Sequence, residues 1–149
     1  MEKKRHTLKN TVMATTAKVI LFLGRTCSGH HHDYKMLKTE FPPESDWFAE
    51  LFVLVDLGYL GIRTDYTGAQ IALPHKKPRK SKHNPDTCLT HEQKAENRAL
   101  SQVRTLIEHA IGGMKRYNIL VDRFRNRRGN FQDDVVAICA ALWNFSLAY

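Results

Sequence analysis

The sequence predicts an α/β fold in which two strands, a helix, two further strands, a long helix and a last helix follow one another. Three observations support this order: paired β-branched segments near the N-terminus, a continuous apolar run at residues 51–55, and an amphipathic stretch without breakers that begins near Thr90. The chain has 149 residues, of which 42% are apolar, enough for one domain with its own core. We therefore expect one α/β domain over residues 1–149.

The N-terminal elements are a predicted hairpin and a short helix. Residues 6–14 and 19–23 are rich in β-branched and apolar residues, and residues 15–18 form the turn between them. Residues 24–29 are a loop bounded by glycines, and residues 32–40 form a helix that Pro42 and Pro43 bring to an end.

The next two strands are short and precede a basic segment. Residues 51–55 have the continuous apolar pattern of a strand buried on both faces of a parallel or mixed sheet. Residues 70–73 form a second strand, closed by Pro74. Residues 75–87 are polar, crowded with lysine and arginine, and interrupted by Pro78 and Pro85, so we expect an exposed basic loop.

The long helix begins at a predicted capping box, with Thr90 as N-cap and Gln93 three residues later. We expect it to run to Ile111, where two glycines weaken it. Its apolar face consists of Leu100, Val103, Ile107, Ala110 and Met114. A basic turn at residues 123–128 precedes a last helix over about residues 132–147. The aromatic residues expected in the core are Trp47, Phe131, Trp143 and Phe145.

The charge balance makes nucleic acid the leading class of partner. Lysine and arginine number 23 against 15 acidic residues, a net charge of +8, which attracts polyanions. The apolar runs are far shorter than the roughly 20 residues of a membrane span, and no export signal follows Met1. The three cysteines lack metal-site spacing, which favours reduced thiols and a cytoplasmic location.

Asp56 stands where the predicted strand at residues 51–55 ends. In α/β sheets ligands bind outside the carboxyl ends of strands, and a carboxylate there can reach a metal ion. The alternative is that Asp56 only caps a turn.

On the long helix, Arg104, Glu108 and Lys115 fall within roughly 40° of one another at about 100° per residue. Asn97 lies on the same stripe. For an arbitrary helix, such a line of charges is a solvated, salt-bridged surface.

The stretch at residues 89–120 resembles the C-terminal signature of insertion-sequence transposases of the DDE class. That signature is Tyr, two residues, Arg, three residues, Glu, six residues, Lys. Arg104, Glu108 and Lys115 match it, whereas Ser101 occupies the tyrosine position. The resemblance extends to Lys4-Arg5-His6-Thr7-Leu8-Lys9-Asn10, Gly29 with His32-Asp33, Asp56-Leu57-Gly58-Tyr59, Leu73-Pro74-His75-Lys76-Lys77-Pro78, Glu108-His109-Ala110-Ile111-Gly112 and Arg123-Phe124-Arg125-Asn126-Arg127-Arg128.

The resemblance implies an RNase H-like mixed sheet flanked by helices, with three carboxylates that bind two Mg²⁺ or Mn²⁺ ions. Asp56 matches the second carboxylate and Glu108 the third, and both would be catalytic. The first, an aspartate on the first strand, has no match, because only Met1, Glu2 and Lys3 precede the Lys4-Arg5-His6 segment. We therefore expect an N-terminally truncated or split-frame portion of the catalytic domain, lacking that strand and inactive by itself.

The same resemblance assigns DNA contacts to basic residues of the helix and of both basic segments. These are Arg104, Lys115, Lys76, Lys77, Arg79, Arg125, Arg127 and Arg128. His32, Asp33 and Asn97 are secondary site candidates. Solvated faces that keep the protein soluble are the alternative for the basic segments, and a polar loop is the alternative for His30, His31 and His32.

The implied function is DNA transposition through metal-dependent phosphodiester cleavage and strand transfer at element ends and target DNA. A non-catalytic DNA-binding or regulatory protein derived from a transposase is the alternative. A structural nucleic-acid protein, in which Asp56 and Glu108 are incidental, is a third hypothesis. Expected protein partners are a second copy of the chain or a separately encoded N-terminal half, in a bacterial cytoplasm near the nucleoid.

Overall fold

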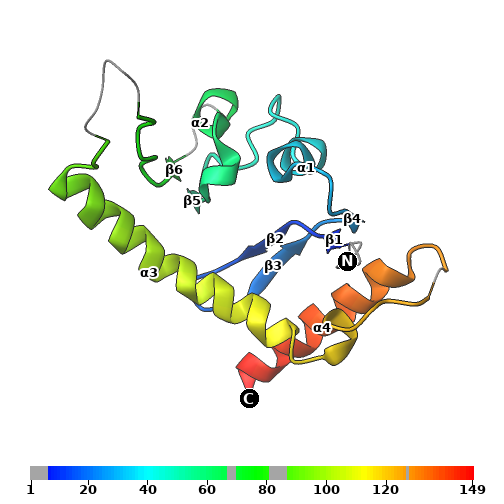
Figure 1. Ribbon diagram of the computed structural model, residues 1–149. Coiled ribbons are helices and arrows are strands. Elements are labelled where there is room, and N and C mark those ends of the chain that lie inside the picture. The colour runs from blue at the N-terminus through cyan, green and yellow to red at the C-terminus, as the bar shows by residue number, and fades with distance from the viewer. Residues whose placement is uncertain (1–6, 67–69, 81–86, 127) are drawn as a thin grey trace, which may run out of the picture. The chain divides into compact units, whose positions relative to one another are not determined.

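The structure is a computed structural model that describes residues 7–66, 70–80, 87–126 and 128–149. It is a mixed α/β chain with three two-stranded sheets among these residues. Two compact units divide it: a first unit of Met1–His32 with Thr105–Tyr149, and a second unit of Asp33–Arg104. Helix α3 (His91–Met114) is continuous in Figure 1 and contributes residues to both units.

The predicted N-terminal hairpin is confirmed over the described residues, in two short ladders of the first unit. Strand β2 (Val12–Ala14) pairs antiparallel with β3 (Ile20–Leu23), and β1 (Leu8–Lys9) pairs antiparallel with β4 (Cys27–Ser28). The loop expected at residues 24–29 is therefore wrong in part, because backbone pairing with β1 makes Cys27–Ser28 a strand. The turn lies at the predicted residues, where Lys18 N–H donates to Thr15 O at 2.9 Å and Lys18 adopts a φ of 68°. His6 lies outside the described residues.

The core of the first unit lies between the hairpin and the two long helices. It consists of Ile20, Ala110, Met114, Ala140 and Trp143. Helix α4 (Phe131–Ala148) confirms the predicted last helix. Asn144 fastens it to β3, because its side-chain amide accepts from Ile20 N–H and donates to Ile20 O, both at 2.9 Å.

The second unit begins with helix α1 (Asp33–Glu40), close to the predicted bounds. Strands β5 (Phe52–Leu54) and β6 (Gln70–Ala72) then form a parallel pair, also at the predicted positions. Between them lie the 3-10 helix η1 (Leu57–Tyr59) and helix α2 (Ile62–Asp65). The buried apolar residues of this unit are Met36, Leu37, Phe48, Ile62 and Tyr66.

The capping box of α3 is present. Gln93 N–H donates to Thr90 Oγ1 at 3.2 Å, and Thr90 N–H donates to Gln93 Oε1 at 3.1 Å. The expected end at Ile111 is wrong, since the helix continues through both glycines to Met114. It can do so because Gly113 lies directly against the Trp143 ring, and this packing compensates for the poor helix propensity of glycine.

Two predictions about burial are wrong. The strand at residues 51–55 is not buried on both faces, because Phe52 is 64% exposed and the residues that follow it are only partly buried. Of the aromatic residues expected in the core, Trp143 is buried, but Trp47 is 48% exposed and Phe145 is 64% exposed. Trp47 packs edge-on against Phe41 instead. Phe145 stacks on Tyr149 near the end of α4, where only one face of the helix meets the core.

Candidate functional site

Asp56 lies two residues beyond the end of β5, at the carboxyl end of the parallel pair. The ladder extends one bond towards it, because Val55 N–H donates to Ala72 O at 3.1 Å. Asp56 is the N-cap of η1, and its Oδ1 accepts from Leu57 N–H at 2.8 Å. Asp56 therefore does cap a turn, as the structural alternative for this residue proposed. This role leaves the carboxylate exposed, so capping and ligand binding are compatible.

Arg104 contacts this same carboxylate within the second unit. Its Nη1 donates to Asp56 Oδ1 at 3.3 Å, and both side chains are 55% exposed. Forty-eight residues separate the two in sequence, so the tertiary fold of this unit brings them together. A signature residue of α3 is thereby joined to the turn that follows β5.

Tyr59 shows how acidic the surroundings of η1 are. Burial raises the pKa of its phenol, and the negative charges of Asp33, Glu40 and Asp56 raise it further. Asp33 also approaches Gly58, since a Cβ on that glycine would lie 3.8 Å from Asp33 Oδ2. The structure therefore brings Asp33, a secondary site candidate, to the turn that carries Asp56.

Asn97 has a role that its place on the charged stripe did not reveal. Its Oδ1 accepts from His75 N–H at 2.7 Å, and its Nδ2 donates to His75 O at 3.0 Å. This two-point contact fixes the chain after β6 against α3. The sequence does contain a signal for this role. The side-chain amide of asparagine offers one donor and one acceptor, so it can pair with a peptide unit as a neighbouring strand would.

Glu108 and Lys115 belong to the first unit, whereas Asp56 and Arg104 belong to the second. Glu108 is exposed on α3, one turn beyond Arg104. Lys115 follows the last residue of α3 and is also exposed, and its N–H still makes a helical bond to Ile111 O at 3.1 Å. Arg104, Glu108 and Lys115 are all exposed, which both a solvated charged surface and a DNA-binding stripe require.

The basic residues of both segments are exposed where the structure describes them, but Thr87, at the end of the loop expected to be exposed, is buried. Residues 75–80 contain no helix or strand, and Lys76, Lys77 and Arg79 are exposed. Residues 81–86 of the predicted basic loop lie outside the described residues, as does Arg127. Arg125 and Arg128 are exposed on either side of it.

His30, His31 and His32 lie in an exposed turn before α1, as a polar loop would. His31 Nδ1 lies 3.1 Å from Ser28 O, a local contact. Within the described ranges, no three His, Cys, Asp or Glu side chains are grouped so that they could hold a metal ion. Those ranges also contain no helix with the length and apolar character to cross a membrane.

A carboxylate thus lies at the end of a parallel strand, and an arginine of the family signature contacts it. A family model also matches most of the chain. The chain belongs to the DDE superfamily endonucleases, whose family model matches residues 1–144, and this confirms the resemblance. It is similar to the probable transposase for insertion sequence element IS702 of Microchaete diplosiphon, with 33% identity over 147 residues. That alignment covers 96% of this chain and 48% of the relative, so the chain spans about half of the relative's length. No solved structure matches the chain.

Proposed function

We propose that this chain carries part of the catalytic centre of a DNA transposase, which cleaves and rejoins phosphodiesters with the help of divalent metal ions. The observation that supports this most strongly is the contact between Arg104 and Asp56. Arg104 belongs to the signature that the chain shares with DDE transposases, and Asp56 matches the second acid of that family. The contact places the Arg104 guanidinium beside a carboxylate at the carboxyl end of β5, where ligands bind in α/β sheets. A phosphate and a metal ion could share such a position.

The proposed fold is RNase H-like, with residues 1–149 as a portion of the catalytic domain. Its support is the order of elements: the β2–β3 hairpin, α1, the parallel β5–β6 pair, and the helices α3 and α4. In such a fold, Asp56 and Glu108 would be metal ligands and catalytic residues.

The donor chemistry of the two acids fits Mg²⁺ or Mn²⁺. Both offer exposed carboxylate oxygens, which these hard cations prefer. Both hydrogen bonds that the described residues make to the Asp56 carboxylate fall on Oδ1, which leaves Oδ2 to a cation. Bound ions would activate the attacking oxygen and stabilise the leaving oxygen. No third acid of residues 1–149 matches the family pattern, so we expect weak metal binding and no robust cutting by this chain by itself.

The basic residues have a separate role in the proposal. Arg104 can grip a phosphate through two parallel hydrogen bonds, and Lys115 can do so as a point charge. Lys76, Lys77, Arg79, Arg125, Arg127 and Arg128 would hold phosphates further along the element end or the target DNA. Asn97 positions the start of the first of these segments through its contact with His75.

Coupling between metal and DNA tests the proposal without the need for cutting. If Asp56 and Glu108 hold an ion against a DNA phosphate, Mn²⁺ tightens DNA binding, and DNA tightens Mn²⁺ binding by the same factor. Asp56→Asn and Glu108→Gln should each abolish this coupling and retain metal-free DNA binding. Wild-type DNA binding that Mn²⁺ does not strengthen would instead favour the non-catalytic DNA-binding alternative. Robust cutting that is lost in Asp56→Ala would overturn the expected inactivity of this chain.

A further inference from the structure

An aromatic and basic surface of the first unit lies outside the proposed metal site. Two shallow hollows meet at Phe131, the first residue of α4. One hollow extends along α4 past Arg128, Val135 and Ile138. The other follows the segment before α4. It is lined by Ile119, Asp122, Arg123, Phe124, Arg125 and Asn126. We call these two hollows together the Phe131 surface.

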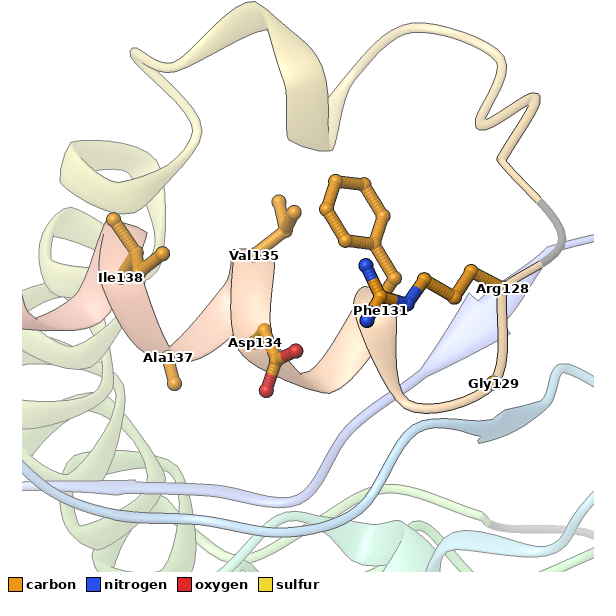
Figure 2. Close-up of a pocket in the computed structure, with 7 residues that line it drawn as sticks. All are labelled: Arg128, Gly129, Phe131, Asp134, Val135, Ala137 and Ile138. Atoms are coloured by element: carbon orange, nitrogen blue, oxygen red, sulfur yellow. The ribbon is translucent and has the colours of Figure 1, made fainter.

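The side chains of this surface form an apolar floor with a charged rim. Figure 2 shows Phe131, Val135 and Ile138 projecting from one side of α4, while Asp134 and Ala137 point away from them. Phe131 also packs against Phe124, with ring centroids 5.7 Å apart and planes inclined by 39°. The two half-buried rings therefore form a tilted aromatic pair at the junction of the two hollows.

The charges of the rim suit a nucleic acid whose bases are accessible. Arg123, Arg125 and Arg128 are exposed and can hold phosphates. Asp122 also lines the second hollow, and its carboxylate would repel a ligand that offered phosphates alone. A carboxylate can, however, accept a hydrogen bond from the amino group of a base. The combination of aromatic rings, arginines and a carboxylate thus fits an unpaired base better than the outside of a duplex.

We propose that the Phe131 surface binds single-stranded DNA, with an unstacked base against Phe131 and the flanking phosphates on Arg123, Arg125 and Arg128. Aromatic rings serve this purpose in single-strand binding because every base has a π face. The inference rests on the proposed role of this segment in DNA binding and adds the strandedness of the ligand. Arg127 is not part of it.

The test compares a single-stranded oligonucleotide that carries one 2-aminopurine with a duplex of the same sequence, using the 149-residue chain. Stacking on Phe131 should quench the 2-aminopurine fluorescence. Phe131→Leu keeps an apolar side chain but removes the ring, and it should weaken single-strand binding by roughly fivefold or more while duplex binding changes little. Phe124→Leu should have a smaller effect in the same direction. Circular dichroism and urea unfolding establish that each variant is folded.

Two matched variants serve as controls. Phe145→Leu removes an exposed ring elsewhere on α4, and Arg25→Gln removes an exposed arginine of the same unit. Both should leave quenching unchanged, whereas Arg128→Gln should reduce it.

The inference is overturned if the protein binds the duplex but does not quench the 2-aminopurine fluorescence of the single strand. It is also overturned if Phe131→Leu binds the single strand as tightly as the wild type does. Either result leaves the proposed DNA-binding role intact. Failure to bind either DNA overturns that role as well. If Phe131→Leu changes the molecular mass of the protein in solution but not its single-strand binding, the surface is a protein interface. That result also overturns the inference.

Discussion

Arg104 Nη1 donates a hydrogen bond to Asp56 Oδ1 at 3.3 Å, which joins α3 to the turn after β5. Both side chains are half exposed, so solvent screens their attraction. The pair is therefore better suited to exchange for another ligand than to hold the fold together.

Replacement of Arg104 by glutamine should separate binding from stability. The free energy of unfolding should change by less than about 0.5 kcal/mol, because exposed ion pairs contribute little. The affinity for DNA should fall, and the slope of log affinity against log salt should decrease by about one, as expected for one lost phosphate contact. Urea unfolding and a salt titration of DNA binding measure the two effects. Arg98→Gln, on another face of the same helix, should leave the salt slope unchanged if the assignment is specific.

Asn97→Ala should destabilise the second unit by about 1–3 kcal/mol, since it leaves the partly buried N–H and C=O of His75 without their partner. Chemical denaturation measures this loss. Gln102→Ala, at an exposed position of α3, is the control and should change stability by no more than about 0.5 kcal/mol. Equal effects of the two substitutions would argue against a stabilising role of the two hydrogen bonds between Asn97 and His75.

The two adjacent glycines of α3 should respond in opposite directions to alanine. A Cβ on Gly113 would lie 2.2 Å from Trp143 Cε3, so Gly113→Ala must displace the indole and should cost about 1–3 kcal/mol. A Cβ on Gly112 meets nothing within 4 Å, so Gly112→Ala should stabilise the helix by up to about 1 kcal/mol. Thermal unfolding of both variants distinguishes them. Similar effects of the two substitutions would contradict the described packing of Trp143.

Asp65 should contribute a pH-dependent part of the stability of the second unit. Hydrogen bonds from Lys38 and then Tyr34 lower the pKa of its carboxyl. A lowered folded-state pKa gives stability that is present above the unfolded pKa, near 3.8, and lost as pH falls through the folded pKa. Urea midpoints between about pH 5 and pH 2.5 should therefore fall less steeply in Asp65→Asn than in the wild type. Equal steepness of the two curves would contradict this contribution of Asp65.

Local signals in the sequence predicted the hairpin, α1, β5, β6, α3 and α4, but they did not predict β4, η1 or α2. The Thr90 and Gln93 capping box marks the start of α3, and the turn at residues 15–18 closes the hairpin, because both depend on neighbouring residues. Burial was harder to predict. The apolar run at β5 indicates a strand but not how many neighbours cover it, so the exposure of Phe52 did not follow from the pattern.

The sequence selects candidate site residues but does not predict the contacts between them. The family signature selects Arg104 and Glu108, and strand position selects Asp56, yet the bond between Arg104 and Asp56 depends on tertiary structure across 48 residues of chain. The pair of hydrogen bonds between Asn97 and the backbone of His75 is likewise a long-range contact. Phe131 was expected in the core from the apolar spacing along the last helix, but it is only half-buried. Spacing along a helix does not show whether another element covers its first turn.

Iron-directed cleavage of the protein backbone tests the proposal that Asp56 and Glu108 bind one metal centre. Fe²⁺ takes the place of Mg²⁺ at carboxylate sites, and with ascorbate and peroxide it produces radicals that cut the chain nearby. We expect cuts close to both Asp56 and Glu108, suppressed by excess Mg²⁺ and lost together in Asp56→Asn. Cuts near only one of the two acids, or cuts that survive in Asp56→Asn, would contradict a shared metal centre.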